Sequence, residues 1–302
     1  MNGFDPRWPF FSLDVELTTK CERSCAFCPH EQLTRPRGEM SGSTWARILA
    51  ESIIHGSRIA FSGMGDPFEC PTWDEKIVQA RKARLTAGIV VPAGSLSEER
   101  ANRLVVCRPS FVEVSFPSLR PEVFRTLQPR DPLEDALEKV LMLRRLGGDR
   151  FPLVIVGLQT GLNVDEETEF LKIWASHGIQ SRMFPCHSRG RNLDKQELIQ
   201  TTRCPESGCG LFARHSFVAW SGELLACCHD LRGETRLGDV NQSSFQDLGM
   251  VKTGILEGRM PFPLCTGCDE CRRGWPLPLQ EAFPVTASGR KRALRRLASA
   301  DK

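Results

Sequence analysis

Short apolar runs alternate with helical patterns along the first two thirds of the chain, and no other feature limits the fold as strongly. The runs are rich in Val, Ile, Leu and Phe, as buried strands are. They lie at 10–17, 58–62, 89–91, 111–116, 153–156 and 180–184. Helical patterns separate them at 41–55, 73–84, 97–104, 133–146 and 166–177. Because strands that alternate with helices form parallel sheets, the sequence predicts an α/β fold, and six strands fit a partial (βα)6 barrel.

Three cysteines lie close together directly after the first apolar run. Cys21, Cys25 and Cys28 are separated by three residues and then by two. Thiolates are soft ligands, which select zinc or iron–sulfur clusters over hard cations. A zinc site needs a fourth ligand, and His30 is a candidate for it. A cubane cluster held by three thiolates would instead leave one iron free to bind a small molecule.

This spacing, with Phe27 before the last cysteine, resembles the radical S-adenosylmethionine (SAM) superfamily. The resemblance implies a [4Fe–4S] cluster on Cys21, Cys25 and Cys28 whose open iron chelates SAM. It also implies that one electron, from a donor such as flavodoxin or ferredoxin, cleaves SAM. The products are methionine and a 5′-deoxyadenosyl radical, which abstracts a hydrogen atom from the substrate.

The resemblance assigns further SAM contacts to residues that follow predicted strands. Gly63, Gly65 and Asp66 match a Gly-Gly-Glu-Pro-like segment that binds the methionine amine, with Asp where Glu is more usual. A plain turn is the alternative for these glycines. Ser115 matches a polar residue that meets the ribose. Arg125 matches an arginine that binds the SAM carboxylate, as a guanidinium group can through paired hydrogen bonds; a solvated surface arginine is the alternative.

Acidic residues recur at alternate positions of two predicted strands. Asp14 and Glu16 share one face of the first strand, and Glu113 and Ser115 share one face of the fourth. If these faces point into the barrel, they line a polar cavity that suits a polyhydroxylated or amine-bearing substrate. Glu16 has an alternative role, in which it caps the cysteine loop or pairs with Arg23.

A second group of cysteines follows the barrel region. Its members are Cys204, Cys209, Cys227, Cys228, Cys265, Cys268 and Cys271. Between Cys209 and Cys227 the sequence predicts a β-hairpin that turns at Ser221-Gly222. A predicted helix then precedes Cys265-Thr266-Gly267-Cys268.

This pattern resembles the twitch domain, the shortened form of the SPASM domain. The resemblance implies an auxiliary [4Fe–4S] cluster on Cys209, Cys227, Cys265 and Cys268. Cys204 and Cys271 are alternative ligands for Cys209 and Cys268. Cys228 is expected to point away as a free thiol, because neighbouring strand residues face opposite sides.

Cys186 is the candidate for a catalytic thiol. It follows the sixth predicted strand, where barrel strands deliver catalytic side chains. A thiol can give a hydrogen atom to a carbon radical, and the chain has no tyrosine for that task. A structural thiol beside the domain junction is the alternative. Cys70 and Cys107 lie in apolar surroundings and are expected to be inert core thiols.

Length and composition define the broad class of the chain. Its 302 residues allow a radical SAM barrel over 1–195, a twitch domain over 196–283 and a basic tail over 284–302. A net charge of +3 from 40 basic and 37 acidic residues gives no reason to expect a nucleic-acid partner. No apolar run is long enough for a bilayer, and the first residues lack a signal peptide. Thirteen cysteines without such a signal predict a reducing, cytoplasmic location.

The overall plan resembles twitch enzymes that act on small molecules, such as 2-deoxy-scyllo-inosamine dehydrogenase and the sugar epimerases of aminoglycoside biosynthesis. It implies hydrogen abstraction from a carbinol carbon of an aminoglycoside or aminocyclitol. Cys186 favours epimerisation of that carbon. Dehydrogenation to a ketone is the alternative, and modification of a ribosomal peptide is a third possibility.

Overall fold

The computed structural model describes residues 10–201, 209, 211–212, 215–256, 262–266 and 268–270. A nine-stranded sheet runs through this part of the chain in the order β6-β5-β4-β3-β2-β1-β7-β8-β9. Its first six strands are β1 (Ser12–Val15), β2 (Arg58–Phe61), β3 (Ala87–Pro92), β4 (Val112–Ser115), β5 (Leu153–Gln159) and β6 (Gln180–Pro185). Each pairs in parallel with the next. The predicted parallel α/β sheet is confirmed.

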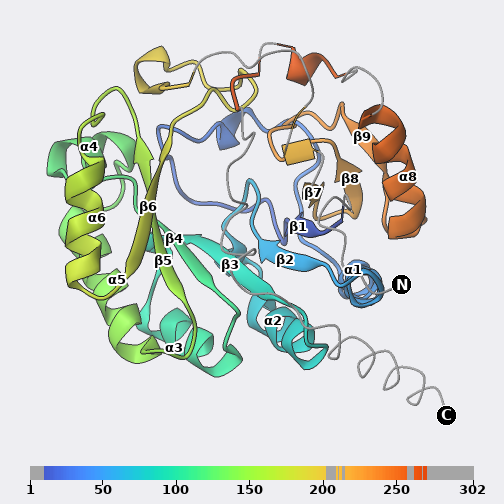
Figure 1. The fold of residues 1–302 in the computed structure, drawn as a ribbon, viewed down its shortest axis with the longest axis horizontal. Coiled ribbons are helices and arrows are strands. Elements are labelled where there is room, and N and C mark those ends of the chain that lie inside the picture. Colours follow the sequence, from blue (N-terminus) through green and yellow to red (C-terminus); the bar gives the residue numbers. More distant parts are fainter. Residues whose placement is uncertain are drawn as a thin grey trace.

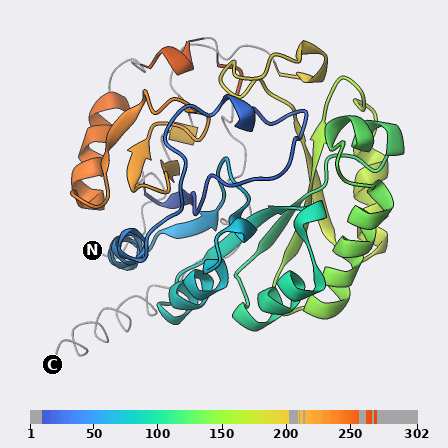
Figure 2. The ribbon, with the colours of Figure 1, turned by 180° about the vertical axis from the view of Figure 1, so that it is seen from behind.

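Helices cover the outer side of this curved sheet (Figures 1 and 2). They are α1 (Gly42–His55), α2 (Trp73–Lys82), α3 (Glu98–Cys107), α4 (Pro121–Leu127), α5 (Leu133–Gly147) and α6 (Glu167–Ser176). Short 3-10 helices lie at His30–Gln32, Pro67–Glu69, Ala93–Ser95, Gln196–Leu198 and Pro263–Cys265. Ser41 caps α1, since its hydroxyl accepts the N–H of Thr44. None of the described helices is both long and apolar enough to cross a bilayer.

The C-terminal part extends the same sheet. It consists of β7 (His215–Val218), β8 (Glu223–Leu225), β9 (Arg236–Asp239) and α8 (Phe245–Leu256). The predicted hairpin is confirmed: β7 and β8 pair in antiparallel fashion around Gly222, whose φ of +96° suits glycine. The other edge of β7 pairs in parallel with β1. The sheet is therefore continuous from the barrel strands into the hairpin, and α8 lies at the end opposite to α6 (Figures 1 and 2).

The largest apolar cluster of the described residues lies between the sheet and its helices. Phe116, just after β4, contacts Trp174 of α6 and Phe124 of α4, each with a ring-centroid distance of 5.1 Å. Full burial of such side chains stabilises the fold by about 1.5–3 kcal/mol each. Cys70 and Cys107 belong to this core, as their apolar surroundings predict.

Candidate active site

The loop after β1 carries the three clustered cysteines. The N–H of Cys28 donates to the carbonyl oxygen of Cys25 at 3.0 Å, which folds the loop into a turn. Burial raises the pKa of Cys25 to about 12, and the charges of Cys28 and Cys21 add to this effect. Burial likewise raises the pKa of Cys21. The three thiols are thus close enough for the charge of one thiolate to raise the pKa of another. Thiols in this setting become thiolates when a soft metal binds them, so the residues fit an iron–sulfur cluster.

Glu16 anchors this loop from the end of β1, where it is fully buried. Its carboxylate accepts two hydrogen bonds from Arg35, at 2.6 and 2.7 Å. It also accepts the N–H of Met64 at 3.0 Å. Of the two alternatives for Glu16, pairing with Arg23 is wrong, because Arg23 extends towards the end of β3 and donates to Ser95 at 2.9 Å. Glu16 therefore holds the loop that carries the cysteines, and its partner is Arg35, which follows the cysteines in the chain.

His30, the candidate fourth zinc ligand, is engaged within the protein. Its Nε2 atom lies 2.8 Å from the carbonyl oxygen of Thr19. A carbonyl oxygen can only accept, so Nε2 carries the proton and donates. Zinc coordination by Nε2 would break this buried contact.

The glycine turn after β2 fits tightly against the end of β1. A Cβ atom on Gly65 would stand 2.1 Å from the backbone oxygen of Thr18. A Cβ atom on Gly63 would stand 2.7 Å from Cγ of Glu16. Only glycine lets the two backbone segments approach this closely. The glycine turn thus lies beside the strand that leads into the cysteine loop.

Asp66, at the end of the glycine turn, is 4% exposed and satisfied inside the protein. One carboxylate oxygen accepts the N–H of Phe68 at 3.0 Å, and the other accepts the hydroxyl of Ser95. Burial raises the pKa of Asp66, and these hydrogen bonds oppose the increase. The carboxylate thus joins the turn after β2 to the turn after β3.

Ser115 and Arg125 lie at the ends of two successive elements, β4 and α4. Ser115 is the half-buried last residue of β4. Arg125 is exposed in the last turn of α4. The end of α4 contacts the cysteine loop directly, since the carbonyl oxygen of Leu127 accepts the N–H of Ala26 at 2.9 Å. Arg125 therefore belongs to a helix that packs on the predicted SAM-binding loop.

Cys186 is 3% exposed directly after β6. It packs in an apolar cluster with Phe27 and Leu127, and Cys25 contacts the same cluster. Burial raises the pKa of Cys186 to about 11, so the thiol keeps its proton at neutral pH. A protonated thiol is the form that donates a hydrogen atom. The structure thus brings Cys186 next to the cysteine loop.

Three of the predicted auxiliary ligands lie near one another. The N–H of Cys268 donates to the carbonyl oxygen of Cys265 at 3.3 Å. Burial, with a contribution from the charge of Cys209, raises the pKa of Cys265 to about 11 and that of Cys268 to about 12. This set of soft donors fits a second cluster. Cys204 and Cys271, the alternative ligands, lie outside the described residues.

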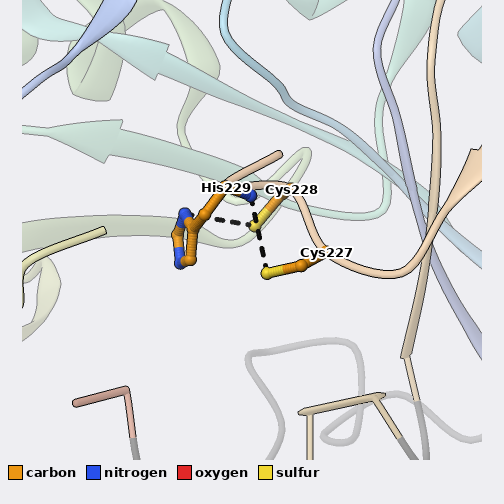
Figure 3. Close-up of side chains that lie close together, drawn as sticks. All are labelled: Cys227, Cys228 and His229. Atoms are coloured by element: carbon orange, nitrogen blue, oxygen red, sulfur yellow. Dashed lines mark hydrogen bonds between the residues drawn. The ribbon is translucent and has the colours of Figure 1, made fainter. Parts of the chain in front are cut away.

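Cys227 and Cys228 turn their sulfur atoms towards each other, with His229 beside them (Figure 3). The Sγ atom of Cys228 lies 3.7 Å from Nδ1 of His229, and that of Cys227 accepts the N–H of His229 at 3.5 Å. The expectation that Cys228 points away is wrong. Both residues lie in a turn beyond β8, where the alternation of strand side chains no longer applies. Cys228 is therefore placed as an alternative ligand to Cys227.

An acidic pair directly after Cys268 joins the C-terminal segment to the barrel. Asp269 accepts the N–H of Ser188 at 2.8 Å and its hydroxyl at 2.6 Å. Glu270 accepts a hydrogen bond from Nε2 of His229, and Nε2 of His187 lies 3.8 Å away. The sequence alone does not predict this junction. The one signal for it in the sequence is the acidic pair that directly follows the predicted ligand Cys268. The contacts fix the end of β6 against the auxiliary cysteines.

His187, His229 and Glu270 together have the composition of a metal site. The hydrogen bonding of His187 argues against that role. Its Nδ1 atom accepts the N–H of Arg189 at 3.2 Å, so Nε2 carries the proton. A histidine that binds a metal through one ring nitrogen normally donates a hydrogen bond through the other ring nitrogen. In His187 the nitrogen that could bind the metal carries the proton, and the other nitrogen accepts. We therefore assign the three residues to a hydrogen-bonded junction.

Charged residues lie on the concave face of the sheet. Leu13, next to Asp14, belongs to the core under the helices, so Asp14 faces the opposite side. Nε2 of His215 lies 2.8 Å from the carboxylate of Asp14. Glu113 of β4 pairs with Arg182 of β6 at 2.7 Å. The expected polar lining of the concave face is thus present, and each carboxylate has a basic partner.

Comparisons with known proteins agree with this arrangement. The family model described as the Radical SAM superfamily matches residues 15–172. The probable GTP 3′,8-cyclase of Methanothermobacter marburgensis is 28% identical over 203 residues, which cover 67% of this chain and 62% of that protein. The PqqA peptide cyclase of Gluconobacter oxydans is 29% identical over 110 residues, 36% of this chain and 30% of that protein. The chain thus spans less than two thirds of the length of these relatives.

Solved structures share the fold at low sequence identity. BtrN in complex with AdoMet and 2-DOIA has a TM-score of 0.57 and 17% identity, with 91% of this chain and 95% of that chain covered. SuiB of Streptococcus suis bound to precursor peptide SuiA has a TM-score of 0.66 and 13% identity, with 86% and 69% covered. The structure of anSMEcpe with bound AdoMet has a TM-score of 0.64 and 12% identity, with 94% and 91% covered.

Proposed function

This chain belongs to the radical SAM superfamily, and from that premise we propose that it inverts a carbinol carbon of a polar small molecule, an aminoglycoside or aminocyclitol. As a member it binds SAM and an iron–sulfur cluster. In the proposal Cys21, Cys25 and Cys28 hold that cluster. A second [4Fe–4S] cluster is held by Cys209, Cys227, Cys265 and Cys268. When bound, the first cluster and SAM supply the radical that removes a hydrogen atom from the substrate.

The buried thiol of Cys186 carries this proposal. It shares an apolar cluster with Phe27, and Cys25 packs against the same cluster, so it is close to the proposed site of the substrate radical. The S–H bond breaks as a new C–H bond forms on the opposite face of the carbon. The sulfur radical that remains regains one electron from a flavodoxin or ferredoxin and one proton from solvent. This restores the thiol for the next turnover.

The polar concave face supports the proposed substrate class. Asp14 and Glu113 each carry a basic partner, His215 and Arg182. When a substrate binds, the side chains of these pairs can form hydrogen bonds with its hydroxyl and amine groups in place of some of those they form with each other. The structure of BtrN contains 2-DOIA, so a protein of this fold and similar length takes a small molecule.

Two other reactions remain candidates on specific observations. In a dehydrogenation the substrate radical would release a proton to solvent and pass one electron to the proposed auxiliary cluster, which gives a ketone. The auxiliary cysteines next to the barrel favour this outcome. Peptide modification is favoured by the likeness to the PqqA peptide cyclase and to SuiB with its precursor peptide. These reactions differ from epimerisation in their products.

Turnover in deuterated buffer separates the three reactions. The thiol of Cys186 exchanges with solvent, so epimerisation should place one deuterium at the inverted carbon with no other change in mass. Mass spectrometry of an aminocyclitol substrate after anaerobic incubation with SAM and a reductant measures this, and a reaction without SAM is the control. A loss of two hydrogens would show dehydrogenation instead. No turnover of aminocyclitols, with turnover of a peptide, would contradict the substrate class.

Gly65→Ala tests the glycine turn. The new Cβ atom would overlap the backbone oxygen of Thr18, 2.1 Å away, so the turn must move. We expect SAM affinity to fall about tenfold or more, since overpacking costs about 1–3 kcal/mol. Isothermal titration of the reconstituted protein with SAM measures this. Gly254→Ala in α8 is the control because nothing lies within 4 Å of its Cβ position; equal affinities for the two variants would contradict the assignment.

A further inference from the structure

Among the described residues, one lysine is completely buried. Lys252 of α8 is 0% exposed, although lysine is rarely buried without a charged partner. Its Nζ atom donates to the carbonyl oxygen of His215 at 2.7 Å and to the hydroxyl of Ser216 at 2.8 Å. Both acceptors are neutral groups of β7. Among the described residues no carboxylate pairs with this ammonium group.

The negative groups that act on Lys252 are predicted ligands of the auxiliary cluster. Burial lowers the pKa of Lys252 to about 7, and the charges of Cys209 and Cys227 oppose this decrease. Phe212 connects the two regions. Its ring centroid lies 4.7 Å from Nζ, and its backbone N–H donates to Sγ of Cys209 at 3.4 Å. The face of an aromatic ring attracts a cation. Phe212 therefore holds the ammonium group of Lys252 on one side and contacts the predicted ligand Cys209 on the other.

We propose that Lys252 raises the reduction potential of the auxiliary iron–sulfur cluster. This rests on the auxiliary cluster of the proposed function. A reduced cluster carries one more negative charge than an oxidised one, and a nearby buried cation stabilises the more negative state. Four thiolate ligands also give the assembled cluster a negative charge, which favours the charged form of Lys252. Lys252 acts on the cluster through its charge, without binding to it.

The test is an anaerobic redox titration of the full chain, followed by electron paramagnetic resonance. Cys21, Cys25 and Cys28 are replaced by alanine throughout, so that the auxiliary cluster alone is measured. Lys252→Met removes the charge, and Lys252→Arg keeps it. At a fixed potential we expect the ratio of reduced to oxidised cluster to fall about tenfold in Lys252→Met, equivalent to about 59 mV for one electron. Lys252→Arg should change this ratio less than about threefold.

Iron analysis separates failure of this proposal from failure of the proposed function. The triple-alanine protein should hold about four irons per chain; if it holds none, the proposed second cluster is wrong and Lys252 has nothing to tune. With iron bound, an unchanged ratio in Lys252→Met overturns the role of Lys252 alone. If Lys252→Met loses its iron, two further variants are measured: Ser216→Ala for its iron content, and Lys252→Gln for its ratio of reduced to oxidised cluster. Iron loss in Ser216→Ala would show a packing role and overturn the proposal, whereas a lower ratio in Lys252→Gln supports it.

Discussion

Arg35→Met is expected to lower the free energy of unfolding by about 3–5 kcal/mol. The substitution leaves Glu16, which is fully buried, without its guanidinium partner. The N–H of Met64, 3.0 Å from one carboxylate oxygen, cannot replace two charged hydrogen bonds. Denaturant unfolding of the iron-free chain, followed by circular dichroism, measures the effect without interference from metal loss.

An exposed ion pair on the same loop is the matched control. Lys20 lies 3.5 Å from Glu39, and the two side chains are 65% and 33% exposed. Lys20→Met should therefore cost less than about 1 kcal/mol. The double variant Glu16→Leu with Arg35→Met should recover part of the loss, since no charge is left buried. A cost for Arg35→Met no larger than that of Lys20→Met would refute the anchoring role of this pair.

Cys186→Ala is expected to reduce the yield of inverted product at least about a hundredfold, as loss of a catalytic proton or hydrogen donor commonly does. Cleavage of SAM should continue, because Cys186 shares an apolar cluster with Phe27 but is not one of the three proposed cluster ligands. The substrate radical would then pass one electron to the proposed auxiliary cluster and release a proton to solvent, so the oxidised ketone should accumulate. Chromatography with mass detection measures both products and the 5′-deoxyadenosine released.

Cys107→Ala provides the matched control for this experiment. Cys107 is also a buried thiol, and burial raises its pKa to about 12. It lies in α3, in the core under the helices. Both variants create a small cavity and should lose similar stability. Only Cys186→Ala should change the product ratio, and an unchanged rate of inversion in that variant would sink the hydrogen-donor assignment.

Periodicity and turn chemistry made much of the fold predictable. The strand expected at 180–184 is β6 (Gln180–Pro185), and the helix expected at 133–146 is α5 (Leu133–Gly147). In each case local apolar spacing decides the element. The hairpin followed from Ser221-Gly222, since glycine adopts the positive φ of the turn. Apolar spacing and tight turns are local properties, so a single sequence displays them.

The contacts that hold the site together were less predictable. Glu16 and Arg35 are both visible in the sequence, but which arginine reaches a buried carboxylate depends on the path of the loop. Cys228 was misjudged because strand alternation was extended past the end of β8. Lys252 looks like an ordinary helical lysine until β7 and Phe212 enclose it. These features depend on segments that are far apart in the sequence.

The pairing of β1 with β7 affects the order in which this protein folds. Ser12 and His215 are neighbours in the sheet, yet they are 203 positions apart in the chain. During synthesis β1 therefore has an open edge, with unpaired N–H and C=O groups, until the ribosome has released the hairpin. Contacts of such long sequence separation also slow folding, because loop closure must precede them. Among the described strands, the one that leads into the cysteine loop precedes all others in the chain, yet its pairing with β7 can form only after β7 has been made.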